Sequence, residues 1–175
     1  MNSKAMNMFL SEDNVKKHLE HLRTFKLKYS ILEKSVPELK DKEIKEILRL
    51  NLSRDIKEEA LRLLWYIKSH EIFFDSFTEN PKRSESVEKH FMSRERLVYD
   101  IFVIAKDRDH GFLYVYSDWQ GTPHIAVSDG NEGAYMKFEP KLCIDLYEHT
   151  YFSDYGFNKD KYLRNALMYL DTGRL

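Results

Sequence analysis

Hydrophobic residues recur at helical spacing along the first part of the chain. The recurring positions are Val15, Leu19, Leu22, Phe25 and Leu32. Ser11 can cap the N-terminus of such a helix, and the acidic residues after it suit the positive end of the helix dipole. Pro37 cannot continue a helix. The pattern therefore predicts a helix that begins at residues 11–14 and runs to about residue 34.

A second long apolar stripe lies further along the chain. A short amphipathic segment at residues 42–50 precedes it, and Ser53 can cap the helix that starts at Arg54 and runs to about Phe77. The stripe consists of Ile56, Ala60, Leu63, Leu64, Ile67 and Phe74. Residues 78–85 are polar and contain a proline, which marks a boundary. We therefore predict an N-terminal antiparallel helical hairpin domain at residues 1–80.

The pattern changes in residues 81–175. Residues 87–106 read as two helical pieces that meet near Ser93, although the apolar run at 97–104 also fits a strand. Alternating or apolar segments at residues 111–116, 124–128 and 140–145 are separated by turn sequences at 120–123 and 130–133. These segments predict three antiparallel strands in meander order, flanked by helices. The expected fold class is α+β, with the sheet in a C-terminal domain.

Composition narrows the classes of function. The chain is 42% hydrophobic and 33% charged with a net charge of −1, which gives no reason to expect nucleic acid or a membrane surface as a partner. Cys143 is the single cysteine, so an internal disulfide is excluded and a thiolate metal site has no second sulfur. The first ten residues lack a signal-peptide apolar run, and no stretch reaches the ~18 apolar residues of a membrane span. We expect a cytoplasmic protein.

The segment at residues 140–155 carries the most distinctive chemistry. An apolar run ends at Asp145, and His149 follows four residues later. This spacing brings a carboxylate and an imidazole close together, and such a pair of ligands suits Mn, Fe or Zn. The alternative is structural, with an aspartate that caps a helix and a histidine on the surface.

The sequence of residues 145–155, Asp-Leu-Tyr-Glu-His-Thr-Tyr-Phe-Ser-Asp-Tyr, closely resembles the C-terminal signature of iron/manganese superoxide dismutases. That signature reads Asp-x-Trp-Glu-His-Ala-Tyr, and Tyr147 stands in place of the tryptophan. Pro140 also lies five residues before the aspartate, as it often does in the family. The resemblance favours a helix for residues 97–104, which in the family precede the sheet.

The resemblance implies that one Fe or Mn ion per chain is bound by His18, His70, Asp145 and His149. The spacing from Ser11 to His18 matches the first ligand helix of the family, and the aromatic residues after His70 resemble the second. From the pattern alone, His18 could instead be a hydrogen-bonded core residue. His21, on the same helix, is expected to lie elsewhere, among lysines.

Around these ligands the sequence departs from the family. Leu22 replaces a histidine and Lys26 replaces the tyrosine at the mouth of the substrate channel, while Phe152 replaces a tyrosine of the dimer interface. Tyr66 stands where the iron enzymes place the glutamine that holds the metal-bound solvent. Glu132 is the best match to the corresponding glutamine of the manganese enzymes.

These departures define three candidate catalytic residues. Tyr66 lies one helical turn before His70, so its hydroxyl could donate a hydrogen bond to the metal-bound solvent, or it could be a core aromatic. Lys26 lies two turns after His18 and could attract the superoxide anion. Glu132 is the third candidate.

The resemblance also implies a homodimer. Glu148 occupies the position whose carboxylate bonds the ligand histidine of the neighbouring subunit, so we expect Glu148 to bond to His149 of the partner subunit. Tyr147 and Phe152 would lie at the same interface or beside the metal ligands. The alternative for Glu148 is a solvated residue at the start of a helix.

Three functions fit the sequence. The first is a divergent dismutase that converts superoxide to dioxygen and hydrogen peroxide. The second is a metal-binding relative with another redox activity, and the third is a relative without catalysis that acts as a structural or binding module. The four ligand types are all kept, which argues against the third. The choice between Fe and Mn is left open, because the residues around the ligands are those that have changed.

Overall fold

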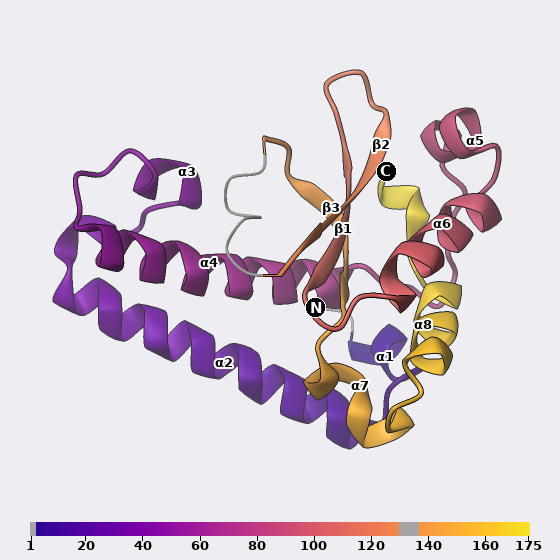
Figure 1. Cartoon of the computed structure of the whole chain (residues 1–175), viewed down its shortest axis with the longest axis horizontal. Helices are drawn as coiled ribbons and strands as arrows, with labels where there is room; N and C mark the ends of the chain where they lie inside the picture. The colour runs from indigo at the N-terminus through magenta and orange to yellow at the C-terminus, as the bar shows by residue number, and fades with distance from the viewer. Residues whose placement is uncertain (1–2, 130–136) are drawn as a thin grey trace.

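The computed structural model describes residues 3–129 and 137–175, and it is built around two long helices. Helices α2 (Glu12–Ser35) and α4 (Arg54–Asp75) run antiparallel to each other along one side of the molecule (Figure 1). The side chain of Ser11 accepts a hydrogen bond from the Asn14 N–H, as the sequence predicts for an N-cap. Ser53 is the N-cap residue of α4, but its side chain makes no capping hydrogen bond.

Three short elements complete the N-terminal half: α1 (Ser3–Met6), a 3-10 helix η1 (Pro37–Leu39) and α3 (Ile44–Ile47). Helix α3 is shorter than the predicted segment at residues 42–50. Helix α1 was not predicted, because it is only four residues long. The segment that contains it is nevertheless packed into the core through Ala5, Met6, Phe9 and Leu10.

The C-terminal half contains a small sheet, with two helices before it and two after it in the chain. Its elements are α5 (Glu85–Phe91), α6 (Arg94–Lys106), β1 (Phe112–Ser117), β2 (Pro123–Ser128), β3 (Pro140–Asp145), α7 (Glu148–Tyr155), α8 (Lys159–Met168) and a 3-10 helix η3 (Thr172–Arg174). Ser93 caps α6 with its side chain, which confirms the predicted break between two helical pieces and the helix over residues 97–104. The α+β fold class is confirmed.

The order of the strands differs from the meander that the sequence suggested. The sheet has the order β2-β1-β3, and β1 pairs antiparallel with both neighbours. The physical reason lies in β1 itself, where Phe112 to Val115 are all buried, so both faces of this strand are covered. A strand buried on both faces suits the centre of a sheet, whereas β2 is partly exposed and forms an edge. The predicted turn at residues 130–133 lies outside the described residues.

Hydrogen bonds attach the long helix α4 to the sheet. The Cys143 N–H of β3 donates to the Ser76 hydroxyl at the end of α4, at 2.7 Å, and the hydroxyls of Ser69 and Tyr114 lie 2.8 Å apart in the core. These bonds fix where the last turns of α4 stand relative to the end of β3. Within the described ranges, no helix is long and apolar enough to cross a membrane.

Candidate metal centre

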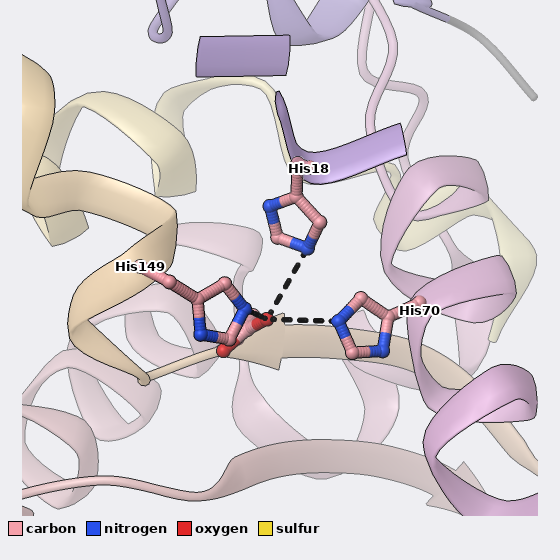
Figure 2. Close-up of side chains that lie close together, drawn as sticks. His18, His70 and His149 are labelled. Carbon is pink, nitrogen blue, oxygen red and sulfur yellow. Dashed lines mark ion pairs between the residues drawn. The ribbon is translucent and has the colours of Figure 1, made fainter. Parts of the chain in front are cut away.

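Four side chains from four separate elements meet between the long helices and the sheet. They are His18 of α2, His70 of α4, Asp145 at the end of β3 and His149 in the first turn of α7. Each offers one ligand atom, and these atoms all lie within 4.8 Å of one another. Figure 2 shows the three imidazole rings pointing toward the same carboxylate oxygen.

The distances converge on one atom of Asp145. Its Oδ2 lies 3.3 Å from Nε2 of His149, 3.4 Å from Nε2 of His18 and 3.8 Å from Nε2 of His70. The side chains of His18, His70 and Asp145 are fully buried, while a third of the His149 side chain is exposed. The centre is therefore enclosed on three sides, and His149 lies at its solvent side.

The atoms that converge are left without hydrogen-bond partners. Among the described residues, His18 Nε2, His70 Nε2 and Asp145 Oδ2 are buried and make no hydrogen bond. A buried polar atom without a partner typically costs about 1–3 kcal/mol, so natural proteins rarely leave three together. A cation that accepts their lone pairs would remove this cost. Three imidazole nitrogens and one carboxylate oxygen suit Fe, Mn or Zn.

Neighbouring groups prepare the ligand atoms for this role. His70 Nδ1 lies 2.6 Å from the Tyr66 backbone carbonyl, so this nitrogen carries the proton and Nε2 keeps its lone pair. The Tyr147 N–H donates to Asp145 Oδ1 at 2.9 Å, and the Tyr162 hydroxyl donates to the Asp145 backbone carbonyl at 2.8 Å. Each bond fixes one polar atom and leaves the ligating atom free.

The electrostatics favour a bound cation. Burial works to raise the pKa of Asp145, but His149 and His18 outweigh it and hold the pKa well below its ordinary value. Burial lowers the pKa of His70 to about 4, despite the opposing charge of Asp145. Burial also works against protonation of His149, but Asp145 dominates and raises its pKa. At neutral pH the site thus holds an ionised carboxylate beside a neutral His70.

Hydrogen bonds at the start of α2 hold His18 and His149 near each other. The buried Asn14 side chain donates through Nδ2 to the Thr150 carbonyl and to Asp154 Oδ2, both at 2.9 Å. The Ser11 N–H also donates to Asp154 Oδ2, at 2.8 Å. These bonds join the first turn of α2 to α7, and each helix supplies one ligand.

Comparison with known proteins identifies the family. Residues 79–172, more than half of the chain, match the family described as iron/manganese superoxide dismutases, C-terminal domain. The chain belongs to the iron/manganese superoxide dismutase family. No curated protein matches the chain. The matched region contains Asp145 and His149, whereas His18 and His70 precede it, so their place beside the other two rests on the structure.

Two tyrosines form a hydrogen-bonded pair next to the ligands. The hydroxyls of Tyr66 and Tyr147 lie 2.8 Å apart, and Tyr147 donates to the Asp129 carbonyl at 2.8 Å. Because Tyr147 uses its hydrogen on Asp129, the hydrogen in the pair comes from Tyr66. Tyr147, at the position of the family's tryptophan, thus accepts from Tyr66, at the position of its glutamine. Donation from Tyr66 to the metal-bound solvent stays a prediction, and Tyr147 competes for the same hydrogen.

The other residues that the sequence analysis singled out have different surroundings. Lys26 forms an ion pair with Glu71 at 2.6 Å, so its charge is compensated on the protein itself, which the sequence did not indicate. Leu22 is buried in the core, and Phe152 is exposed and packs edge-on against Phe157. The exposed Glu148 begins α7, where its predicted role across a dimer interface stays a prediction. Glu132 lies outside the described residues.

His21 lies at the centre, contrary to the expectation that it lies elsewhere. Its ring centroid is 4.6 Å from that of His149 and 5.7 Å from that of His70. Burial lowers the pKa of His21, and His149 and His18 lower it further. The spacing could have predicted this position. His21 follows His18 by three residues, and residues three apart on a helix are neighbours on its surface.

Proposed function

We propose that this protein is a divergent superoxide dismutase that converts two superoxide anions and two protons to dioxygen and hydrogen peroxide. The observation that supports this most directly is the convergence of four ligand atoms from α2, α4, β3 and α7 in a member of this family. His18, His70, Asp145 and His149 would hold one Fe or Mn ion. The bound ion supplies the redox chemistry, since it can alternate between two oxidation states.

The residues of the chain would set the conditions for this chemistry. Asp145 is held ionised, and its negative charge favours the more highly charged state of a cation beside it. The carbonyl of Tyr66 fixes the proton of His70 on Nδ1, so the ligand nitrogen points inward. Burial of three of the four ligands keeps bulk water from most of the centre.

Three further residues are proposed to assist the reaction. Tyr66 would influence the redox potential through its hydroxyl, which is bonded to Tyr147 beside the centre. Lys26, paired with Glu71 two turns along α2 from His18, would govern the local charge that an approaching superoxide anion meets. Glu132 remains a candidate from the resemblance to the manganese enzymes.

One alternative has an observation in its favour. The Tyr66 hydroxyl is engaged with Tyr147, and the Lys26 charge is engaged with Glu71, so both groups that would assist superoxide chemistry have partners within the protein. This arrangement also fits a metal-binding relative with a different redox activity. A relative without a metal is disfavoured, because three of the four candidate ligand atoms, those of His18, His70 and Asp145, are buried without a hydrogen-bond partner among the described residues.

Metal analysis followed by a superoxide-consumption assay tests the proposal. Full-length protein should contain one Fe or Mn per chain, and His149→Ala should lose most of it. His124→Ala is the matched control, because His124 of β2 is exposed and pairs instead with Asp118, which directly follows β1. Full metal content in His149→Ala would refute the ligand assignment. Metal binding without superoxide consumption would favour the alternative redox activity.

A further inference from the structure

Two tyrosine rings lie against two of the candidate ligand rings. The Tyr66 ring stacks on the His70 ring with centroids 6.3 Å apart, and the Tyr147 ring stacks on the His149 ring at 5.7 Å. A phenol gives up one electron more readily than an imidazole or a carboxylate does. These two phenols are therefore the groups beside the ligands that a one-electron oxidation at the centre would attack.

The two phenols also touch each other at the atoms through which they could react. Their hydroxyl oxygens lie 2.8 Å apart, while the ring centroids of Tyr66 and Tyr147 are 6.0 Å apart. A phenol that loses an electron and a proton becomes a radical, and the ring carbons next to the oxygen share its unpaired electron. Two such radicals couple through these ortho carbons. Contact between the hydroxyls holds the ortho carbons of the two rings near each other, which favours coupling within the pair.

A second pair of tyrosines is arranged differently. The rings of Tyr151 and Tyr162 are stacked with centroids 5.1 Å apart, so their faces are in contact. The Tyr162 hydroxyl donates instead to the Asp145 backbone carbonyl at 2.8 Å. The contact through the hydroxyls therefore distinguishes Tyr66 and Tyr147 from this pair.

We propose that Tyr66 and Tyr147 are a modification site, at which hydrogen peroxide formed at the metal centre joins the two rings as dityrosine. The inference rests on the proposed function, because that reaction supplies the peroxide. In the net step, each ring loses the hydrogen of one ortho carbon, a carbon–carbon bond forms between these carbons, and both hydroxyls are kept. The two electrons and two protons released break the O–O bond of one hydrogen peroxide and give two water molecules.

The link would hold together the two halves of the chain that supply the ligands. Tyr66 lies in α4, and Tyr147 directly precedes α7, 81 residues further along the chain. A covalent link over such a separation restricts the unfolded chain and so favours the folded state. Cys143 is the single cysteine and cannot provide an internal disulfide for this purpose. Linked protein should therefore unfold at a higher urea concentration than unlinked protein.

The first experiment treats full-length protein, with the metal that it carries on purification, with hydrogen peroxide. In a tryptic digest, Tyr66 is the single tyrosine of peptide 63–68. Mass spectrometry of the wild type should find this peptide joined to the one that contains Tyr147, with the loss of two hydrogen atoms. Tyr66→Phe and Tyr147→Phe should each lose the joined peptide. Tyr151→Phe should keep it and is the matched control, since Tyr151 lies in the same tryptic peptide as Tyr147.

The second experiment tests the arrangement of the two rings without metal or peroxide. Full-length protein is dialysed against a chelator and irradiated with near-ultraviolet light, which ionises phenols directly, so no reagent has to reach them. The wild type should again give the joined peptide of Tyr66 and Tyr147. Circular dichroism of each variant shows whether the fold is retained.

Each outcome decides the proposal. A wild type without the joined peptide after peroxide treatment would overturn it, even if light forms the link, and so would a joined peptide that persists in Tyr66→Phe. Equal urea midpoints of linked and unlinked protein would overturn the stabilising role. If the purified protein contains no Fe or Mn, the proposed function fails, and irradiation of the metal-free chain still shows whether Tyr66 and Tyr147 are placed to join.

Discussion

Single hydrogen bonds determine which atoms of the ligand residues remain free. His70 and Asp145 each have two polar atoms, and in each case the protein satisfies one and leaves the other at the centre. The partner of His70 is the backbone carbonyl of Tyr66, so a change in the Tyr66 side chain need not disturb it. A mutation of Tyr66 can therefore test the role of its side chain while the role of its backbone carbonyl is kept.

Tyr66→Phe tests the role of the hydroxyl alone. The variant keeps the carbonyl that orients His70, so metal content should stay at the wild-type level. Loss of the bond to Tyr147 should lower the free energy of unfolding by about 1 kcal/mol. The redox potential of the bound metal should shift, because a hydroxyl that polarises the surroundings of the ligands is removed.

Potentiometry measures the redox potential of wild type and Tyr66→Phe, and metal analysis of the same preparations measures their metal content. Tyr99→Phe is the matched control, since Tyr99 is an exposed residue of α6 and the Arg96 guanidinium lies over its ring. A potential equal to that of the wild type would show that Tyr66 is a core aromatic without influence on the metal.

The sequence predicts individual residues well only where a motif or a helical period constrains them. Asp145 and His149 belong to a short signature, and His18 follows from its spacing to Ser11. The ion pair of Lys26 with Glu71 and the bond of Tyr66 to Tyr147 join residues of different elements, and only the packed structure brings them together. The position of His21 could have been predicted from the sequence, because its spacing from His18 places both residues on the same helix face.

At the scale of secondary-structure elements, the joint between α2 and α7 is what brings two ligands together. Asp154, near the end of α7, accepts hydrogen bonds from the Ser11 N–H and the Asn14 side chain at the start of α2. Partial burial works to raise the pKa of Asp154, but these hydrogen bonds outweigh it and hold the pKa below its ordinary value. The ionised carboxylate is therefore the form that stabilises the joint.

Asp154→Ala should lower the free energy of unfolding by about 1 kcal/mol at pH 7, since the bonds are charge-assisted but the carboxylate is partly solvated. The folded-state pKa lies below the unfolded value, so this stabilisation is present above about pH 4 and is lost as pH falls through the folded pKa. Urea unfolding of wild type and variant across this range measures the difference. Asp109→Ala, which removes an exposed carboxylate before β1, is the control. A difference that persists at low pH would show that the charge is not responsible.

The elements themselves follow from the sequence far better than their order in the sheet. Periodicity and caps predict α2, α4 and the break at Ser93, and alternation or apolar runs predict the three strands. Neighbouring strands in the chain usually pair, which favours a meander. The burial of both faces of β1 decides the central position instead, and part of that burial comes from α4, which is distant in sequence and contacts Phe112 and Tyr114.

At the scale of the whole molecule, the net charge would not attract an anionic substrate. The net charge is −1, so any attraction must come from the local arrangement of charges near the centre. Lys26 and Glu71 form an ion pair that joins helix α2 to helix α4. Removal of one partner exposes the charge of the other.

Lys26→Ala should lower the second-order rate of superoxide consumption by roughly threefold at low ionic strength, because the Glu71 carboxylate is left uncompensated and repels the anion. The effect should shrink at high ionic strength, where screening weakens interactions between exposed charges. Lys26→Ala combined with Glu71→Ala should restore most of the rate. Lys34→Ala, in the last turn of α2, is the control. If Lys26→Ala changes neither the rate nor its salt dependence, Lys26 is only a solvated helix residue.

The metal centre also links the two halves of the chain. His18 and His70 come from the helical hairpin, and Asp145 and His149 come from the C-terminal half, so a metal ion held by all four residues would require both halves in place. The division into domains at residues 1–80 and 81–175 stays a prediction. If this boundary is correct, a chain cut there would separate His18 and His70 from Asp145 and His149.

The exposed first turn of α7 leads to a prediction about assembly. Glu148 is exposed, and the side chain of the neighbouring His149 is one-third exposed although its ring points toward Asp145, so solvent reaches both residues at the start of α7. A carboxylate from a second copy could therefore reach His149 without rearrangement of the fold. We predict a homodimer in which Glu148 bonds to His149 of the partner subunit, and through which two centres lie near a shared two-fold axis.

Light scattering at micromolar concentration should give the mass of a dimer for the wild type. Glu148→Ala should shift the population toward monomer and should release metal more readily, because His149 loses the group that orients it. Glu38→Ala removes an exposed glutamate from η1, at the far end of α2, and should change neither property. A wild-type monomer at this concentration would refute the dimer. A dimeric Glu148→Ala with unchanged metal retention would show that Glu148 is a solvated residue at the start of α7.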